Sequence, residues 1–222
     1  MIKVNKLSKV FLEGTKKEFL ALDNVNFSIS KNECVLIKGV SGSGKSTLLS
    51  ILGAMSKPTS GEVLIEGVNY AKLSDDKASD FRLNKIGFIF QSYHLIEDLT
   101  LVQNIKTPLI CKKLSEAEKL EKIEAAKIVS NILDKDNIMA KDLSGGEKQR
   151  CAIARALVLD PDIIIADEPT ANLDRDNSLR FIEAMRRLKS LGKTIIISTH
   201  DEIFDDNDLA DRVIKMEYGK NI

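Results

Sequence analysis

Residues 39–46 of the chain read Gly39-Val40-Ser41-Gly42-Ser43-Gly44-Lys45-Ser46. This spacing fits the phosphate-binding loop of nucleoside triphosphatases. Glycines let a backbone wrap around a phosphate without side-chain clashes, and the positive end of a following helix adds to the field. Lys45 is predicted to reach the β- and γ-phosphate oxygens, and the Ser46 hydroxyl to ligate Mg²⁺. The predicted nucleotide-binding residues of this region are Gly39, Ser41, Gly42, Ser43, Gly44, Lys45, Ser46 and Thr47.

The segments around this loop predict strands that alternate with helices. The apolar run 34–37 reads as a buried strand, and residues 47–52 read as the start of a helix. Further strands are expected at 2–4, 25–29, 61–65, 86–90, 163–167, 194–198 and 213–216. Helices are expected at 75–85, from 146 to 159, at about 178–191, and through most of 100–133, where Ser115-Glu116-Ala117-Glu118 forms a capping box. This alternation indicates an α/β fold with a mostly parallel core sheet covered on both faces and a helical subdomain inserted between 91 and 144.

One expected strand, at 163–167, ends in the adjacent carboxylates Asp167 and Glu168. Ligands bind beyond the carboxyl ends of the strands in open α/β sheets, so both residues are expected beside the loop. Asp167 is predicted to hold Mg²⁺ through water. Because strand side chains alternate, Glu168 is expected to point the other way, where it could orient or deprotonate an attacking water. Taken alone, the pair could instead mark a loop start or a helix cap.

Composition limits the range of functions. The 222 residues are 43% hydrophobic and 30% charged, which suits one domain or a domain with a subdomain. Basic and acidic residues both total 33, so binding to bulk nucleic acid or to an anionic membrane through net charge is not expected. Cys34, Cys111 and Cys151 show neither metal spacing nor a disulfide framework. No signal-peptide pattern and no apolar run of roughly 18 residues is seen, so a role at a membrane is expected to need a separate membrane subunit.

A second glycine-bearing helix start reads Leu143-Ser144-Gly145-Gly146-Glu147-Lys148-Gln149-Arg150. Ser144 and the following glycine backbone could form another anion cradle, and a capped helix start without a ligand is the alternative. With this segment the chain resembles the ATP-binding cassette (ABC) family, whose signature reads LSGGQ or LSGGE. The resemblance extends from Phe11 to the strand after His200. The departures are Phe11 where Tyr is commoner and Cys151 where a small aliphatic residue is more usual.

The resemblance implies a P-loop NTPase fold of the ABC-ATPase type, as a single domain over residues 1–222. A RecA-like core with an antiparallel β subdomain would occupy about 1–90 and 160–222, and an α-helical subdomain about 92–145. ATP and Mg²⁺ are the implied ligands, and ATP hydrolysis is the implied reaction. Two copies are expected to pair head to tail, so that each signature closes over the γ-phosphate in its partner. The residues expected to act in trans are Leu143, Ser144, Gly145, Gly146, Glu147 and Asp174.

Other family landmarks occur in the expected order. Gln91 matches the Q-loop glutamine, which contacts Mg²⁺ or the attacking water, and Asp174 lies in a match to the D-loop, which crosses the dimer interface. His200 matches the switch histidine that hydrogen-bonds the γ-phosphate, although a solitary histidine is usually structural. Phe11 stands where the family places an aromatic ring that stacks on adenine, and a core phenylalanine is the alternative. The implied catalytic residues are Glu168, His200 and Gln91, and the implied metal ligands are Ser46, Gln91 and Asp167.

Residues 87–95, 98–100 and 166–170 look like the group that serves lipoprotein release, macrolide and peptide export, haem efflux and cell division. This implies an ATPase subunit that powers export, extraction or force transmission through an integral membrane permease. It would be cytoplasmic, on the inner face of the membrane, a homodimer when ATP is bound, and without a nucleic-acid partner. One alternative is a regulatory ABC ATPase of a membrane complex that moves no cargo. The other, a soluble ABC ATPase acting on nucleic acid or ribosomes, would call for fused cassettes, a long coiled coil or marked basicity.

Overall fold

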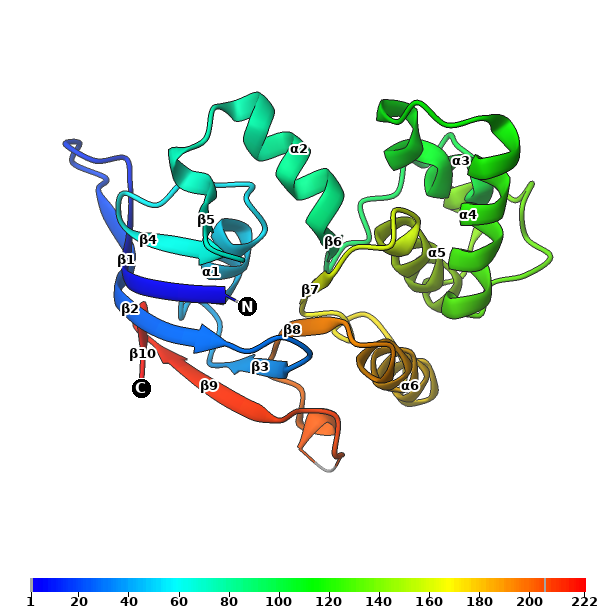
Figure 1. Cartoon of the computed structure of the whole chain (residues 1–222). Helices are drawn as coiled ribbons and strands as arrows, with labels where there is room; N and C mark the ends of the chain where they lie inside the picture. Colours follow the sequence, from blue (N-terminus) through cyan, green and yellow to red (C-terminus); the bar gives the residue numbers. More distant parts are fainter. Residues whose placement is uncertain (1, 206) are drawn as a thin grey trace.

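The computed structural model describes residues 2–205 and 207–222. Its centre is a six-stranded sheet in the order β10-β9-β3-β8-β7-β6 (Figure 1). The strands are β3 (Cys34–Lys38), β6 (Ile86–Ile89), β7 (Ile163–Asp167), β8 (Thr194–Thr199), β9 (Arg212–Glu217) and β10 (Lys220–Asn221). Neighbours from β9 to β6 pair in parallel, and β10 pairs antiparallel with β9. The predicted α/β class with a mostly parallel core sheet is confirmed.

Side-chain alternation in these strands supplies two separate cores. Val35 and Ile37 of β3 belong to one apolar cluster, whereas Cys34 and Leu36 belong to the other. β7 and β8 divide their side chains in the same way. Because successive side chains face opposite sides, a strand covered on both faces must be apolar throughout. The apolar run around 34–37 has this physical origin.

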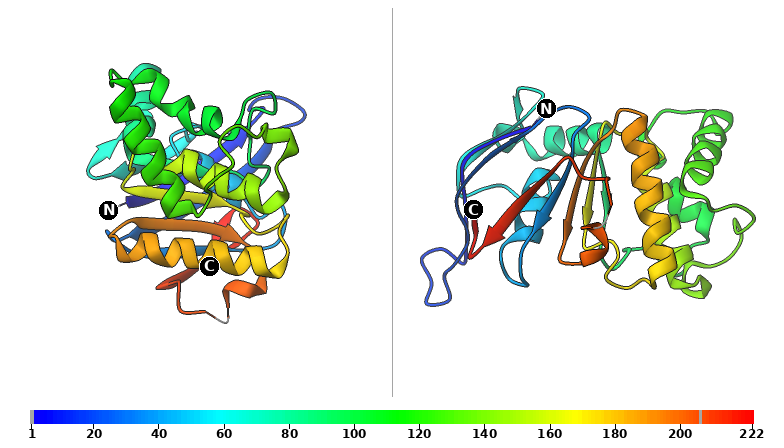
Figure 2. Two further views of the ribbon diagram at one scale, coloured as in Figure 1. Left: turned by 90° about the vertical axis from the view of Figure 1, so that its right-hand side faces the viewer. Right: turned by 90° about the horizontal axis from the view of Figure 1, so that it is seen from below.

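One face of the core sheet is covered by α1 (Lys45–Leu52) and, beyond it, by a second sheet (Figure 2). This four-stranded antiparallel sheet has the order β2-β1-β4-β5. Its strands are β1 (Ile2–Phe11), β2 (Phe19–Ile29), β4 (Ser60–Ile65) and β5 (Val68–Asn69). Asn26 and Asn221 join the two sheets, because Asn26 N–H donates to Asn221 Oδ1 at 2.9 Å and Asn221 Nδ2 donates back to Asn26 O at 3.0 Å. The phosphate-loop helix is therefore held between two sheets.

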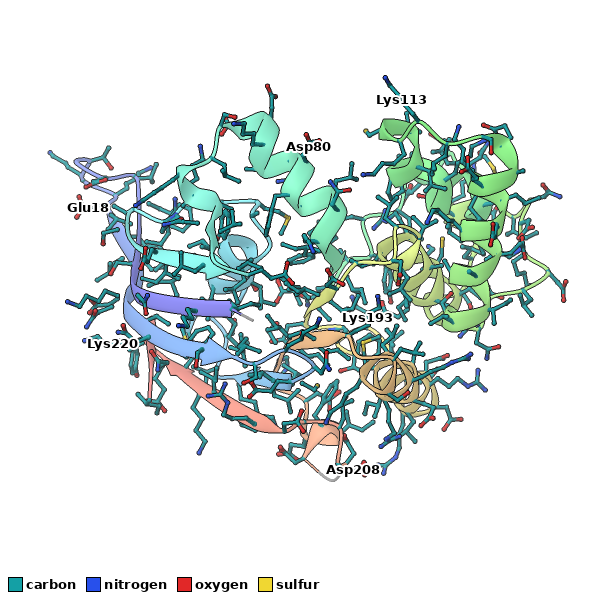
Figure 3. All side chains as sticks on the ribbon, viewed as in Figure 1. Glu18, Asp80, Lys113, Lys193, Asp208 and Lys220 are labelled. Carbon is teal, nitrogen blue, oxygen red and sulfur yellow. The ribbon has the colours of Figure 1, made fainter. Side chains whose placement is uncertain are left out.

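The opposite face is covered by α6 (Arg175–Ser190), which buries Phe181, Ile182, Met185 and Leu188 at helical spacing. Beyond it lie α3 (Leu101–Lys106), α4 (Glu116–Ser130) and α5 (Gly145–Leu157) (Figure 1). Helix α2 (Asp75–Lys85) precedes β6, and short 3₁₀ turns occupy Tyr70–Lys72, Thr107–Cys111, Ala140–Asp142 and Glu202–Phe204. Charged side chains such as Lys113 and Asp208 project from the periphery (Figure 3). Across the described ranges, no helix combines the length and apolar character needed to cross a bilayer.

Several element boundaries differ from the sequence-based ones. β1 spans ten residues where 2–4 were expected, because its exposed face carries polar side chains that hide the alternation. The helical region expected over 100–133 divides into α3, a 3₁₀ turn with Pro108 in its first turn, and α4. The capping box that opens α4 is confirmed: Glu118 N–H donates to Ser115 Oγ at 3.3 Å, and Ser115 N–H donates to Glu118 Oε2 at 2.7 Å. α6 begins at Arg175, before the expected 178, because Asp174 accepts the Asn177 N–H at 2.8 Å.

Candidate functional site

The loop between β3 and α1 has a backbone that requires glycine. Gly42 and Gly44 have φ angles of +79° and +99°, in a region that residues with a Cβ rarely adopt. A Cβ at Gly44 would lie 2.7 Å from the Ala21 carbonyl oxygen, and a Cβ at Gly39 would lie 2.3 Å from the Met216 carbonyl oxygen. The loop therefore packs against β2 and β9 so closely that larger residues would displace it.

Lys45, the first residue of α1, folds its side chain back over the loop. Its buried Nζ donates to the carbonyl oxygens of Gly39 at 2.7 Å and Val40 at 3.2 Å. The same Nζ lies 3.3 Å from Glu168 Oε1. A buried ammonium needs such partners, and here they hold a positive charge at the centre of the loop.

Asp167 meets the start of α1 through a hydroxyl. Its Oδ1 accepts hydrogen bonds from Ser46 Oγ at 3.1 Å and from Ser198 Oγ at 2.5 Å. Two adjacent oxygen donors fit Mg²⁺, which binds through one or two protein oxygens and fills its octahedron with water and substrate phosphates. No group of three or more His, Cys, Asp or Glu within residues 2–205 and 207–222 could hold a metal ion. A cation at Ser46 and Asp167 would therefore take its other ligands from a nucleotide and water.

Glu168 follows β7 without continuing its alternation. Its φ angle is +44°, and its N–H donates to the Ser198 carbonyl at 3.0 Å and the Ser198 hydroxyl at 3.1 Å. Asp167 contacts Ser46 of the loop helix, and Glu168 lies beside Lys45, the preceding residue. Glu168 lies beyond the last strand residue, and the backbone turns there, so strand alternation does not set the direction of its side chain.

The carboxylate of Glu168 stands between a cation and an imidazole. Its Oε2 accepts the His200 backbone N–H at 3.3 Å and lies 2.9 Å from His200 Nδ1, while Oε1 faces Lys45. Only 8% of Glu168 is exposed, whereas the His200 ring is exposed. A shielded carboxylate held by two nitrogen groups is suited to orienting a water molecule and accepting its proton.

Most of these groups border one cavity of about 360 Å³, whereas Asp167 and Ser198 lie outside its lining. It is lined by Phe19, Ala21, Ser41, Gly42, Gly44, Lys45, Ser46, Thr47, Gln91, Glu168 and His200. The lining comes from β2, the glycine loop and the segments that follow β6, β7 and β8. The carboxyl ends of neighbouring parallel strands meet at one edge of the sheet, which explains why residues so distant in sequence converge there.

Some predicted residues of this region lie outside the cavity lining. Ser43 is buried under the loop, and Gly39 lies against Met216. Phe11 pairs with Phe19 across the β1–β2 hairpin, and the two rings stack with centroids 6.4 Å apart. Phe19 lines the cavity and Phe11 does not. Stacking of Phe11 on a base stays a prediction, and Phe19 is the ring that borders the cavity.

The second glycine-bearing helix start lies elsewhere on the molecule. Ser144 opens α5 with a capping box, in which Glu147 N–H donates to Ser144 Oγ at 3.4 Å and Ser144 N–H donates to Glu147 Oε2 at 2.9 Å. The hydrogen bond from the Ser144 N–H lowers the pKa of Glu147. A Cβ at Gly146 would lie 2.4 Å from Asn177 Oδ1 of α6. None of residues 143–147 lines the cavity of the glycine loop, and neither does Asp174, which caps α6.

Hydrogen bonds connect the loops around the cavity. The Gln91 carbonyl accepts from Asn172 Nδ2 at 3.2 Å, and Thr170 Oγ1 donates to Asp201 Oδ2 at 2.7 Å. The segment after β7 is therefore tied both to the segment after β6 and to the one after β8. A shift of any one of these loops would be passed to the other two.

The backbone just after Gln91 is strained and held by α5. Tyr93 and His94 have φ angles of +61° and +48°, which are unfavourable for residues of this size. The Arg155 guanidinium donates to both of their carbonyl oxygens, each at 2.5 Å, and burial lowers the pKa of this arginine. The Tyr93 hydroxyl lies 3.7 Å from where a Cβ of Gly145 would stand. Residues 93–94 thus lie against both the start of α5 and Arg155, about three turns further along that helix.

Three side chains that shape this geometry are absent from the sequence-based predictions. Ser198 bonds both Asp167 and Glu168, and a hydroxyl within the apolar strand at 194–198 was the available signal. The only sequence signal for Phe19 was that an aromatic residue precedes an apolar run. Arg155 offered no signal, because its partners are backbone carbonyls distant in sequence.

Known proteins resemble this chain over most of its length. A family profile described as ABC transporter matches residues 22–171. The lipoprotein-releasing system ATP-binding protein LolD of Blochmanniella floridana is 42% identical over 184 residues, covering 81% of this chain and 77% of LolD. The macrolide export ATP-binding/permease protein MacB of Vibrio parahaemolyticus is 36% identical over 222 residues, covering 100% of this chain but 34% of MacB.

A third relative has solved structures. The uncharacterized ABC transporter ATP-binding protein MJ0796 of Methanocaldococcus jannaschii is 41% identical over 206 residues, covering 90% of this chain and 87% of that protein. A dimeric structure of MJ0796 matches with a TM-score of 0.91 at 38% identity, over 100% of this chain and 96% of that one. A dimeric post-hydrolysis state of MJ0796 bound to ADP and Pi matches with the same TM-score at 36% identity and the same coverage.

Proposed function

Because the chain belongs to the ABC transporter family, we propose that two copies form a head-to-tail, ATP-bound homodimer that drives a separate integral membrane permease. The chain itself is an ABC transporter ATP-binding subunit with ATPase activity. LolD and MacB are named for lipoprotein release and macrolide export. Those names support export or extraction as the process that this subunit powers. In this proposal the subunit is cytoplasmic and lies on the inner face of the cell membrane.

The separation of the signature from the loop cavity is the observation that carries this proposal. Ser144 and Gly145 are exposed, yet the cavity of their own chain is lined by other residues. The N–H groups at the start of α5 can bind an anion, so a second copy could bring them over the nucleotide. The dimeric state of MJ0796, which matches this chain throughout, supports such a pairing.

Residues in and next to the cavity have distinct roles in the proposed site. Ser46 and Asp167 would hold Mg²⁺, which neutralises charge at the β- and γ-phosphates when bound. Lys45 would exchange its carbonyl contacts for phosphate oxygens. Glu168 would orient the attacking water and accept its proton, while His200 contacts the γ-phosphate. Gly42 and Gly44 would allow the loop backbone to adopt the positive φ angles with which it wraps around the phosphates.

The segment 91–109 is the proposed contact with the permease. It follows Gln91, which lines the nucleotide cavity, so a change at the nucleotide can reach it directly. Ile96 within it is 51% exposed and Ile110 just beyond it is 74% exposed. Isoleucine is usually buried, so exposed isoleucines on a short segment are suited to contact another protein.

The test uses Glu168→Gln, which keeps the shape of the side chain and removes its charge. We expect ATP turnover to fall at least about 100-fold, because a general base contributes on that scale. Light scattering should show a dimer in Mg·ATP, because hydrolysis no longer separates the halves. Lys45→Ala is the control and should stay monomeric because it loses nucleotide binding. A Glu168→Gln chain that stays monomeric in ATP and hydrolyses at the normal rate would refute the proposal.

A further inference from the structure

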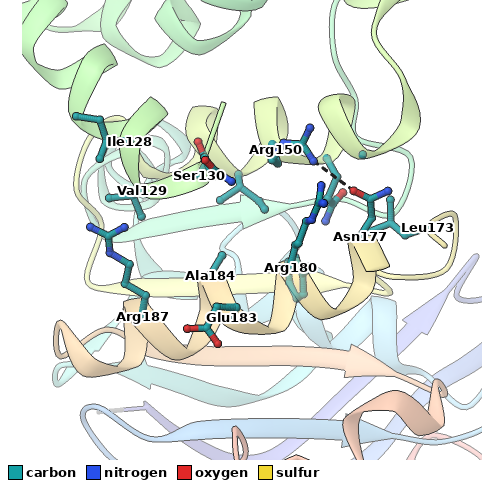
Figure 4. A pocket seen from close by; sticks show the side chains of 15 residues that line it. Ile128, Val129, Ser130, Arg150, Leu173, Asn177, Arg180, Glu183, Ala184 and Arg187 are labelled. Carbon is teal, nitrogen blue, oxygen red and sulfur yellow. Dashed lines mark hydrogen bonds between the residues drawn. The ribbon is translucent and has the colours of Figure 1, made fainter. Parts of the chain in front are cut away.

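A second cavity, of about 310 Å³, lies between α6 and the helices α4 and α5 (Figure 4). It shares no lining residue with the cavity of the glycine loop. One wall comes from the end of α4 and from α5, and the other from α6. Its volume lies at the lower end of the range for sites that bind small molecules.

The walls of this cavity have an excess of positive charge. Arg150 on α5 and Arg180 and Arg187 on α6 all line it, against a single carboxylate, Glu183. Glu183 is paired with Arg186, a residue outside the lining, at 2.6 Å. Within the described part of the chain, neither Arg180 nor Arg187 has a carboxylate within 4.0 Å. In Figure 4 both side chains rise from α6 toward the facing helices.

Arg150 lies near the positive charge of Arg180 and forms no ion pair with a carboxylate of the described residues. Its Nη1 donates to Asn177 Oδ1 at 3.3 Å, and its buried Nε has no acceptor among the described residues. Burial, and then the charge of Arg180, lower the pKa of Arg150. Guanidinium groups left near one another in this way create a field that attracts carboxylates and phosphates.

Gln149 provides an independent sign of a missing partner. It lines the cavity and is 2% exposed, yet both Nε2 and Oε1 lack a hydrogen-bond partner within the described ranges. Folded proteins rarely leave buried side-chain amides without partners. The Gln149 amide therefore offers a ligand one hydrogen-bond donor and one acceptor beside the three arginines.

The rest of the lining combines the polar residues Ser130, Asn131 and Asn177 with a group of apolar side chains. Ile128 and Val129 come from α4, Ile153 from α5, and Phe181 and Ala184 from α6. We propose that this cavity binds a small organic anion, with a phosphate or carboxylate on the arginines and an apolar group against these side chains. Such a ligand would join α6, which packs on the core sheet, to the helical segment that carries the signature.

Phenyl phosphate tests this proposal, with inorganic phosphate and phenol as its two halves. The ¹⁵N-labelled chain is first saturated with Mg·ADP, so that the glycine loop is occupied and added anions report on other sites. We expect phenyl phosphate to shift, saturably, the amide signals of residues that line the second cavity. Inorganic phosphate and phenol should each bind at least about tenfold more weakly, because each lacks one set of contacts.

The variant that tests the arginines is Arg180→Gln/Arg187→Gln, at two exposed positions where folding should be unaffected. It should weaken phenyl phosphate binding at least about tenfold, through loss of charge-assisted hydrogen bonds. Arg175→Gln is the matched control, since Arg175 is also on α6 but outside the lining, and its affinity should stay within about twofold of the parent. The proposal is overturned if phenyl phosphate leaves these signals unshifted, if the double variant binds normally, or if either half-probe binds equally well.

Discussion

Ser198 holds both acidic residues of the nucleotide site through one hydroxyl. Its Oγ donates to Asp167 Oδ1 at 2.5 Å and accepts the Glu168 N–H at 3.1 Å. A hydroxyl can donate once and still accept, so a single atom fixes the proposed metal ligand and the proposed base relative to each other. Without it, Asp167 would keep its contact with Ser46, and the Glu168 N–H would keep only its bond to the Ser198 carbonyl.

We therefore expect Ser198→Ala to lower kcat about tenfold while leaving ADP affinity nearly unchanged, because the loss affects positioning of the base more than phosphate binding. Steady-state hydrolysis and calorimetric ADP binding measure the two quantities. Ser130→Ala is the control: Ser130 is also buried, and its hydroxyl bonds only helix carbonyls of α4. Each variant should lose about 1 kcal/mol of stability. Equal kcat values for the two variants would show that Ser198 is merely structural.

Asp211 connects β3, β9 and α6 at the point where β3 and β9 begin. Its Oδ2 accepts the Cys34 N–H of β3 at 2.8 Å, and its Oδ1 pairs with Lys189 of α6 at 2.8 Å. Its own N–H donates to the Cys34 carbonyl at 2.9 Å, next to the start of β9. Burial acts to raise the pKa of this carboxyl, but the Cys34 N–H and Lys189 outweigh burial, and the pKa falls below its ordinary value of 3.8.

Asp211→Asn should lower the free energy of unfolding by about 1 kcal/mol near neutral pH, a modest value because the pair with Lys189 is partly exposed. A carboxyl whose pKa is lower in the folded state stabilises above its unfolded pKa, and this stabilisation is lost as the pH falls through the folded value. The difference between parent and variant should therefore shrink below about pH 4. Urea denaturation across pH measures it, with Asp208→Asn, at an exposed pair with Arg186, as the control. A difference that grows as the pH falls would contradict this account.

Elements buried on two faces were predictable from sequence, and elements with a polar face were less so. The position of β7 is evident from the sequence because every side chain from 163 to 166 is apolar. For β1, the sequence indicates only the first three residues of the strand. The two-residue strands β5 and β10 are too short for any periodicity. At the site, residues in local motifs were found, including Lys45 and the residues after β6, β7 and β8. Ser198 and Arg155 were not, because their roles depend on neighbours that only the folded chain supplies.

On the scale of the whole molecule, the two glycine-bearing helix starts of one chain lie apart. The loop before α1 borders one cavity, whereas the start of α5 lies outside it with Ser144 exposed. A closed two-fold pairing places the same patch of each copy against its counterpart, so two composite sites would form together. The proposed dimer is the assembly in which both helix starts act on one triphosphate.

Mixing variants tests whether the sites are shared. Lys45→Ala chains and Ser144→Arg chains should each be inactive alone, because the first bind no nucleotide and the second form dimers with a damaged signature at both sites. In an equal mixture, a dimer of one chain of each kind has one intact site of two, so no more than about half of the parental ATPase rate should return. Initial rates of phosphate release measure this recovery. A mixture that stays inactive, or one with the full parental rate, would rule out shared sites.

The contacts of Tyr93 have a consequence for communication between the two nucleotide sites of the proposed dimer. The Tyr93 hydroxyl lies near Gly145, at the helix start that would face the partner's nucleotide. Arg155 donates a hydrogen bond to the Tyr93 carbonyl. Tyr93 is also only two residues from Gln91, which lines the cavity of its own chain. In the proposed dimer, residues 91–93 would thus link the nucleotide cavity of one chain to the helix start that faces its partner's nucleotide. A rearrangement at one nucleotide site would therefore reach the helix start that contributes to the other site.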